Sequence, residues 1–355
     1  MNKNISEIIA RGNNNLDLIR LIAAIAVIVY HSFAINPQWG LVDPIKSFFG
    51  HTSTGGIAVK IFFFISGLLV TNSIISRRSS IHFVVSRVFR IFPGLVFVLI
   101  STALIIGPIV TSLGIGQYFS EKGTYTYILN NILLNTEYFL PGVTFNNNYG
   151  INGSLWTIRY EVIAYIVLFF AFLFRLTTNK LIASLACVMI IAEPITPFKG
   201  VLFASSNDSA IFLLAPSFAL GCLFAINKDR FKSTWIIPIL MLLASIATTN
   251  ATLSALLLCT SMCLFSLQVA SRPIILRIKL QNDISYGVYL WGFPIQQLLH
   301  PYFIAGPVIG MLSPIFLSCM VAYVSWVLIE KPAIGLSKKI SKSYLSSLPV
   351  KNTHE

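Results

Sequence analysis

Long apolar stretches constrain this 355-residue chain more than any other feature. A stretch of about 20 apolar residues is long enough to cross the hydrocarbon core of a bilayer as a helix. The sequence contains ten apolar stretches that we interpret as spans, at 16–35, 57–76, 84–109, 154–174, 181–198, 209–226, 234–249, 251–270, 284–303 and 306–329. We therefore predict an all-α, polytopic integral membrane protein with about ten transmembrane helices.

The composition supports this prediction and excludes other classes of protein. Hydrophobic residues make up 55% of the chain and charged residues only 10%, whereas about a quarter of the residues in soluble domains are charged. The net charge of +13 suggests nucleic acid as a partner, but the basic residues lie in short connections between apolar stretches, so we exclude it. All five cysteines lie within apolar stretches, which argues against disulfides, and no metal site is predicted.

The basic residues also predict the orientation of the chain in the membrane. With the N-terminus in the cytoplasm, 20 of the 25 Lys and Arg residues fall on the cytoplasmic side, as the positive-inside rule requires. Both termini are then cytoplasmic. We expect a single transmembrane domain over 1–340 and a cytoplasmic polar tail over 341–355, with Pro332 ending the last helix. The extracytoplasmic loop 111–152 contains a weaker apolar stretch at 124–140, interpreted as an interfacial or re-entrant helix.

Ionisable residues within the first apolar stretch point to a functional site, because such groups are costly in a membrane. Arg20 and His31 are eleven residues apart, close to three helical turns, so they share one helix face about 16 Å apart at about 1.5 Å per residue. Asp17 lies on nearly the same face. A core histidine bonded to a backbone carbonyl is the alternative interpretation of His31, but the charged stripe favours function.

Arg87 and Arg90 lie three residues apart at the start of the third apolar stretch. Their guanidinium groups can converge on an anion, and phosphate suits such a pair. Anchoring at the cytoplasmic surface is the alternative, and it explains the neighbouring Arg77 and Arg78 better. The preceding FFFISG segment, 62–67, ends in two small residues that permit close approach of a helix or ligand.

A third ionisable group lies in NGSLWTIRYEV, 152–162, at the start of the fourth apolar stretch. Glu161 is about 12 Å from Gly153 at helical rise, which places a carboxylate at membrane depth. We predict that Glu161 contacts His31, which approaches from the opposite end of its own helix. Arg159 is the alternative partner.

Several segments in one order resemble the acyltransferase-3 family of membrane-bound O-acyltransferases. They are LDLIRLIAAIAVIVYH at 16–31, FFFISG, the Arg87-x-x-Arg90 pair, GSLWTIRYE, SYGVYLWGFP at 285–294 and the closing EKP. The resemblance implies a multi-pass protein of the bacterial cytoplasmic membrane. It also implies transfer of an acyl group, usually acetyl from cytoplasmic acetyl-CoA, to a hydroxyl of an extracytoplasmic carbohydrate such as lipopolysaccharide O-antigen or exopolysaccharide. Acetyl-CoA is then a substrate, and no permanently bound cofactor is expected.

The resemblance assigns roles to the residues already singled out. Arg20, Arg87 and Arg90 would bind the phosphates of acetyl-CoA. His31 would be the general base or the acyl carrier. The other expected site residues are Glu161 and Asp17 with His31 in the catalytic set, and Ser66, Ser154, Trp156 and Arg159 as oxyanion or acceptor contacts. Related chains often have histidine where this chain has Gly292, so a second catalytic imidazole there is not expected.

Two other functions are compatible with intramembrane ionisable residues. A transporter or flippase for a lipid-linked sugar uses similar groups for proton relays, but it often contains internal repeats, and none is evident here. The second alternative, an inactive sensor with the same fold, is disfavoured because His31, Arg87, Arg90 and Glu161 are all present.

Overall fold

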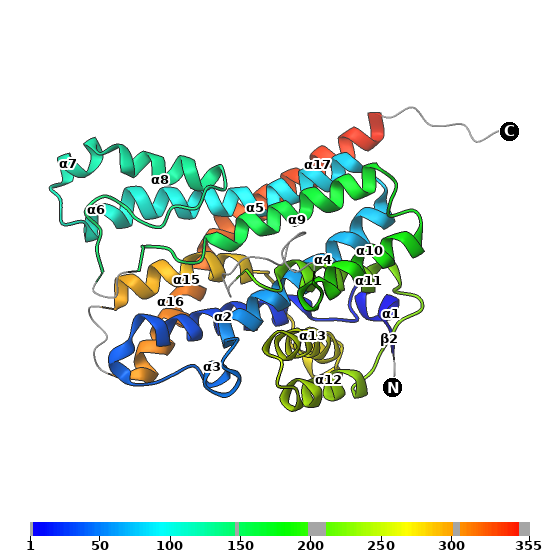
Figure 1. Cartoon of the computed structure of the whole chain (residues 1–355). Helices are drawn as coiled ribbons and strands as arrows, with labels where there is room; N and C mark the ends of the chain where they lie inside the picture. The colour runs from blue at the N-terminus through cyan, green and yellow to red at the C-terminus, as the bar shows by residue number, and fades with distance from the viewer. Residues whose placement is uncertain (1–2, 146–148, 198–210, 301–305, 348–355) are drawn as a thin grey trace.

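The computed structural model describes residues 3–145, 149–197, 211–300 and 306–347, and these are almost entirely helical (Figure 1). Two short strands, β1 (Lys3–Asn4) and β2 (Lys232–Ser233), pair antiparallel. The helices are α1 (Ile5–Ile9), α2 (Leu16–Ile35), α3 (Pro44–Phe49), α4 (Thr54–Arg77), α5 (Ser80–Ser101), α6 (Gly107–Val110), α7 (Ile115–Ser120), α8 (Lys122–Ile132), α9 (Trp156–Leu173), α10 (Lys180–Ala192), α11 (Leu214–Ile226), α12 (Ile236–Ala247), α13 (Ala251–Ala270), α14 (Pro273–Leu276), α15 (Ser285–Leu299), α16 (Pro307–Ser325) and α17 (Lys331–Ser347).

The predicted all-α membrane architecture is confirmed, while the count of ten spans stays a prediction. Six helical segments within the described ranges are long and apolar enough to cross a membrane: Leu16–Ile35, Thr54–Arg77, Ser80–Val110, Trp156–Leu173, Ala251–Ala270 and Pro307–Tyr344. The other four expected spans correspond to α10, α11, α12 and α15, which are helical but only 12 to 15 residues long.

The end of the chain differs from the prediction. Pro332 does not end the last helix, because α16 continues through a π-helical turn, Trp326–Glu330, into α17. Pro332 is then the second residue of α17, and the wider π turn before it accommodates a residue that lacks a backbone N–H. Helix α17 continues past residue 340 to Ser347, so part of the expected polar tail is helical.

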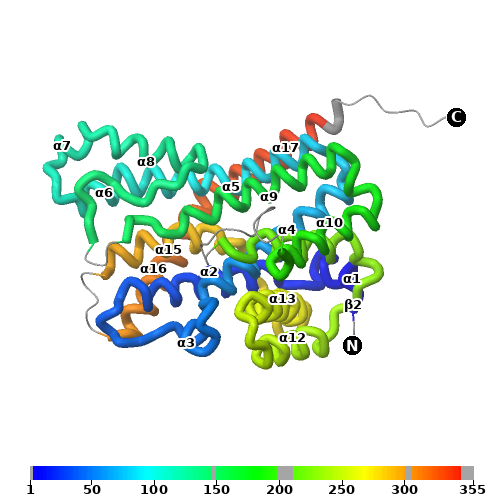
Figure 2. Tube along the Cα trace, in the orientation of Figure 1, coloured from blue at the N-terminus to red at the C-terminus, as the bar shows by residue number. Residues whose placement is uncertain are grey.

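Two groups of helices flank the central helices. Figure 2 shows α5 running beside α17, and α5 also contacts α9. Helices α12 and α13 form a hairpin on another side of the molecule.

The segment expected at 124–140 is helical only in its first part, as α8. Leu134 takes a left-handed backbone conformation, which follows the end of this helix.

Helix α4 lies at the centre, against α2 on one side and α11 on the other. It meets α11 at two glycines: the backbone carbonyl of Phe218 lies over Gly67, and the carbonyl of Phe64 lies over Gly221. A side chain at either glycine would overlap the opposite backbone. The close helix approach predicted from FFFISG is therefore present, and it fixes the position of α4, which lines both cavities described below.

We expect Gly67→Leu to prevent stable packing of α4 on α11, because the new side chain would occupy the position of a backbone carbonyl that cannot move aside alone. The measurement is the yield and thermal midpoint of detergent-solubilised protein. Gly335→Leu in α17 is the matched control, since nothing lies within 4 Å of the position its Cβ would take. Equal yield and midpoint for both variants would contradict this packing.

Candidate active site

Two of the cavities between the helices contain most of the predicted site residues, and they differ in chemistry. The first, about 240 Å³, is the arginine cavity; its polar lining residues include Arg20, Ser66, Arg87, Arg90, Glu161 and Tyr165. The second, about 500 Å³, is the histidine cavity; its lining residues include His31, His51, Lys60, Tyr149, Trp156 and Phe293. Residues predicted to bind an anion thus line one cavity, and the predicted catalytic imidazole lines the other.

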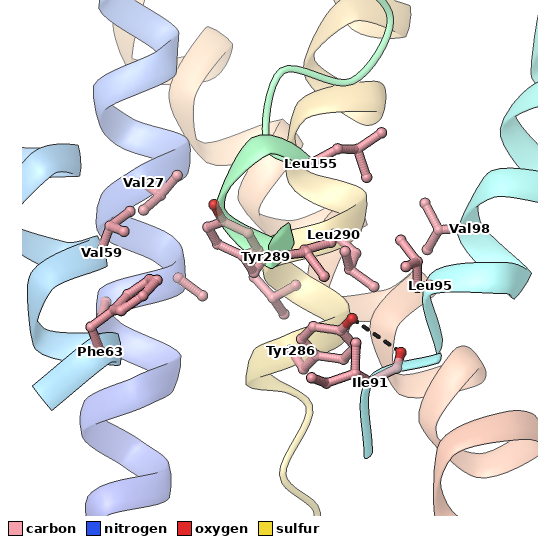
Figure 3. Close-up of a cluster of buried hydrophobic side chains, with 14 of the residues drawn as sticks. Val27, Val59, Phe63, Ile91, Leu95, Val98, Leu155, Tyr286, Tyr289 and Leu290 are labelled. Carbon is pink, nitrogen blue, oxygen red and sulfur yellow. Dashed lines mark hydrogen bonds between the residues drawn. The ribbon is translucent and has the colours of Figure 1, made fainter. Parts of the chain in front are cut away.

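Val59 and Tyr289 line both cavities and separate them. Figure 3 shows Val59 beside Val27 on neighbouring helices, and Tyr289 on α15 across from them. The Tyr289 hydroxyl donates to the carbonyl oxygen of Ser154 (3.1 Å) and lies 2.7 Å from the hydroxyl of Thr157. These bonds fix the tyrosine between the cavities.

The arginine cavity is organised by a carboxylate that the sequence analysis did not select. Asp283, in the loop before α15, pairs through one oxygen with Arg20 Nη1 (2.9 Å) and Arg90 Nη2 (2.5 Å). Burial raises the pKa of this carboxyl, but Arg20 and Arg90 outweigh that effect, so the pKa of Asp283 lies well below its usual range. Asp283 therefore remains ionised and joins α2 to α5.

Arg90 has a second carboxylate neighbour and two aromatic ones. Its Nη1 lies 3.9 Å from Glu330 Oε2, in the π-helical turn, and Glu330 is only 1% exposed. The guanidinium carbon lies 5.8 Å from the ring centre of Tyr286 and 5.7 Å from that of Trp326. The π turn, which ends at Glu330, thus helps to hold Arg90 in the arginine cavity, and π turns often occur at functional sites.

Arg87 is held differently from Arg20 and Arg90. Its guanidinium carbon lies 5.9 Å from the ring centre of Tyr165, and its Nε donates to the hydroxyl of Ser86 (3.4 Å). Within the described ranges Arg87 makes no salt bridge, so its charge faces the cavity without a protein carboxylate bound to it.

The predicted contact between His31 and Glu161 is wrong. Glu161 lines the arginine cavity, where it accepts hydrogen bonds from Tyr165 (2.5 Å) and Ser66 (3.4 Å). Helix α9 contacts α4, which supplies Ser66, and this turns Glu161 away from the imidazole. Arg159, the alternative partner, is exposed and makes no salt bridge within the described residues.

His31 lies among aromatic rings. The ring centre of Phe293 is 4.9 Å away in an edge-on arrangement, and that of Tyr30 is 5.5 Å away. Its Nδ1 is buried and has no hydrogen-bond partner among the described residues. A buried polar nitrogen without a partner is unusual unless a ligand or water completes it, so the imidazole fits a role in chemistry better than one in packing.

The remaining predicted residues are divided between the cavities and the rest of the molecule. Trp156 lines the histidine cavity, whereas Asp17 is exposed and lines neither cavity. Ser154 is buried, and its hydroxyl has no partner within the described part of the chain. At Gly292 a Cβ would lie 2.7 Å from a side-chain carbon of Ile28, so this position packs on α2.

Asp283, His51 and Lys60 were not selected by the sequence analysis, and Glu330 was included there only as part of the EKP segment. Asp283 is one of only twelve acidic residues in the chain and directly precedes an apolar helix, a signal that can be read from the sequence. His51 reaches the histidine cavity from the loop after α3, whereas Lys60 reaches it from α4. Within residues 3–145, 149–197, 211–300 and 306–347, no three His, Cys, Asp or Glu side chains gather to hold a metal ion.

A family model described as an acyltransferase domain, acyltransferase-3, matches residues 13–330. The chain belongs to the acyltransferase-3 family. It is therefore an O-acyltransferase enzyme, which disfavours the transporter interpretation.

Two relatives match along nearly their whole length. The chain is 30% identical over 345 residues to an "O-acetyl transferase" of Shigella phage Sf6, covering 90% of this chain and 95% of the relative. It is 27% identical over 369 residues to "Nodulation protein 10" of Rhizobium leguminosarum bv. viciae, covering 94% and 96%. "O-acetyltransferase OatA" of Staphylococcus aureus strain MRSA252 is 25% identical, over 95% of this chain and 59% of the relative. No solved structure gives a significant match.

We expect Tyr289→Phe to destabilise the protein where the two cavities meet, because it removes the hydrogen bonds of the Tyr289 hydroxyl to the Ser154 carbonyl and the Thr157 hydroxyl. These two groups then keep only the 3.4 Å bond between them. The loss should be about 1–2 kcal/mol, seen as a thermal midpoint a few degrees lower in detergent. Tyr125→Phe is the control, since its exposed hydroxyl bonds only the carbonyl of Phe119. The same midpoint for both variants would contradict the role of these bonds.

Proposed function

We propose that this enzyme transfers an acetyl group from cytoplasmic acetyl-CoA to a hydroxyl of an extracytoplasmic carbohydrate, in the cytoplasmic membrane of a bacterium. The observation that carries the proposal is the pair of cavities on either side of Val59 and Tyr289. One cavity has the charges to bind a phosphorylated donor. The other has an imidazole and aromatic walls suited to a sugar.

The arginine cavity suits the nucleotide end of acetyl-CoA. Arg20, Arg87 and Arg90 line it, and charge-assisted hydrogen bonds from guanidinium groups to phosphate oxygens are among the strongest in proteins. Arg87, which has no salt bridge in the described ranges, is the first contact we assign to a phosphate. The coenzyme's arm then has to reach about 16 Å along α2, at about 1.5 Å per residue, from Arg20 to His31.

The histidine cavity suits a carbohydrate acceptor. Its walls include the rings of Tyr149, Trp156 and Phe293, which can pack against the apolar faces of sugar rings. With ten spans and both termini in the cytoplasm, this cavity opens to the extracytoplasmic side. The names of the phage and staphylococcal relatives, O-acetyl transferase and O-acetyltransferase, support a hydroxyl as the acceptor, and an O-antigen or exopolysaccharide sugar is our candidate.

His31 performs the transfer in this proposal. As a general base it takes the proton from the acceptor hydroxyl; that oxygen attacks the thioester carbonyl, and the coenzyme leaves as a thiol after protonation. Such base catalysis contributes about 10²–10⁴ in rate. In the alternative, His31 attacks first and carries the acetyl group. The buried Ser154 hydroxyl is the candidate donor to the oxyanion.

Glu161 takes a different role from the one expected. Because it bonds Tyr165 and Ser66 in the arginine cavity, it does not orient the His31 imidazole directly. We propose that Glu161 supports the arginine cavity, because it holds Tyr165, whose ring contacts the Arg87 guanidinium. The proposed transfer assigns no role to Asp17 or Arg159, both of which are exposed.

The test is incubation of purified protein with acetyl-labelled acetyl-CoA and crude envelope glycans. We expect the wild type to label the glycan fraction and His31→Ala to lose at least about 100-fold of this activity. His82→Ala, at the start of α5 and outside both cavities, is the control. Equal labelling by wild type and His31→Ala would contradict the proposed chemistry, and no labelling by the wild type would contradict the donor or the acceptor class.

A further inference from the structure

Asp283 does not line the arginine cavity, but it bonds two of the arginines that do. Its carboxylate accepts from Arg20 Nη1 and Arg90 Nη2 through the same oxygen. The two arginines come from helices far apart in sequence, and both line the arginine cavity. Their side chains are only 17% and 16% exposed, so without a carboxylate between them two buried like charges would repel each other.

The carboxylate of Asp283 is itself fixed by the start of α15. Its other oxygen accepts from the hydroxyl (2.6 Å) and the backbone N–H (3.3 Å) of Ser285. The neighbouring Asn282 accepts from Trp326 Nε1 (3.0 Å), and Asn15 Nδ2 donates to the carbonyl of Ile278 (2.6 Å). The loop that carries Asp283 is thus tied to α2 and to the π turn, so the aspartate is a fixed support and not a mobile side chain.

Each arginine retains most of its hydrogen-bonding capacity after pairing with Asp283. A guanidinium group has five N–H donors in a planar fork, and each arginine gives one N–H to the aspartate oxygen. Apart from Arg90 Nη1, which faces Glu330 at 3.9 Å, the remaining N–H groups are the ones available to an anion in the cavity. Because one oxygen holds both forks, their relative orientation is set before any ligand arrives.

We propose that Asp283 is a positioning residue for the donor: it holds Arg20 and Arg90 at the spacing at which both bind the phosphate groups of acetyl-CoA. This inference rests on the proposed function and adds a residue to it. It predicts that loss of the carboxylate weakens recognition of the phosphates and leaves the chemistry at His31 intact.

The experiment compares two donors that share the thioester and differ in phosphates. Acetyl-CoA carries the phosphate groups, whereas S-acetylpantetheine lacks them. We expect Asp283→Asn to lower the ratio of kcat/KM for acetyl-CoA to that for S-acetylpantetheine by about tenfold or more, mainly through KM, since hydrogen bonds between guanidinium and phosphate groups are among the strongest in proteins. Asp283→Glu, which keeps the charge, should recover part of the ratio.

The controls separate this role from others. Glu121→Gln removes an exposed carboxylate before α8, outside both cavities, and should leave the ratio unchanged. An unchanged ratio in Asp283→Asn, with both donors affected equally, would overturn the proposal in favour of a structural role. A lower KM for acetyl-CoA would overturn it by showing that Asp283 competes with phosphate. Failure of the wild type to use either donor would instead contradict the proposed function.

Discussion

Charged side chains buried among apolar helices are costly without a partner, and the pairing of Arg20 and Arg90 determines how several helices of this enzyme come together. A buried guanidinium without a partner is costly, so Arg20 on α2 and Arg90 on α5 require a carboxylate between them. Asp283 supplies it from the loop before α15, and Glu330 approaches Arg90 from the π turn after α16. Segments near both ends of the chain are thereby joined at one cavity.

The close packing of α4 complements these ion pairs. Gly67 and Gly221 let the α4 and α11 backbones approach each other directly, and α4 then carries Val59 into the position where, with Tyr289, it separates the two cavities. Backbone contact on one side of α4 and the cavities on the other give the helix a defined rotation. That rotation decides which side chains can meet a donor or an acceptor.

The sequence predicted the features that depend on one helix at a time. The spacings of Arg20 and His31 along α2 and of Arg87 and Arg90 along α5 are properties of single helices, as is the presence of the small residue Gly67 on α4. The structure brings Arg20, Arg87 and Arg90 to one cavity. Contacts between helices were not predictable in this way. Glu161 was expected beside His31 but faces Ser66 and Tyr165, because the rotation of α9 depends on what it packs against. The rarity of acidic residues and the place of Asp283 before an apolar helix are visible in the sequence, but its partners, 263 and 193 residues away, are not.

We propose that the arginine cavity opens to the cytoplasm, that the histidine cavity opens to the opposite side of the membrane, and that the two meet at Val59 and Tyr289. Single cysteines at Ser66, in the arginine cavity, and at Thr52, in the histidine cavity, test it most directly with a membrane-impermeant thiol reagent applied to either face of sealed vesicles. The unsubstituted protein, whose five cysteines are buried or half-buried, gives the background. We predict that Ser66→Cys reacts only from the cytoplasmic face and Thr52→Cys only from the opposite face. Reaction of both from the same face would contradict the claim.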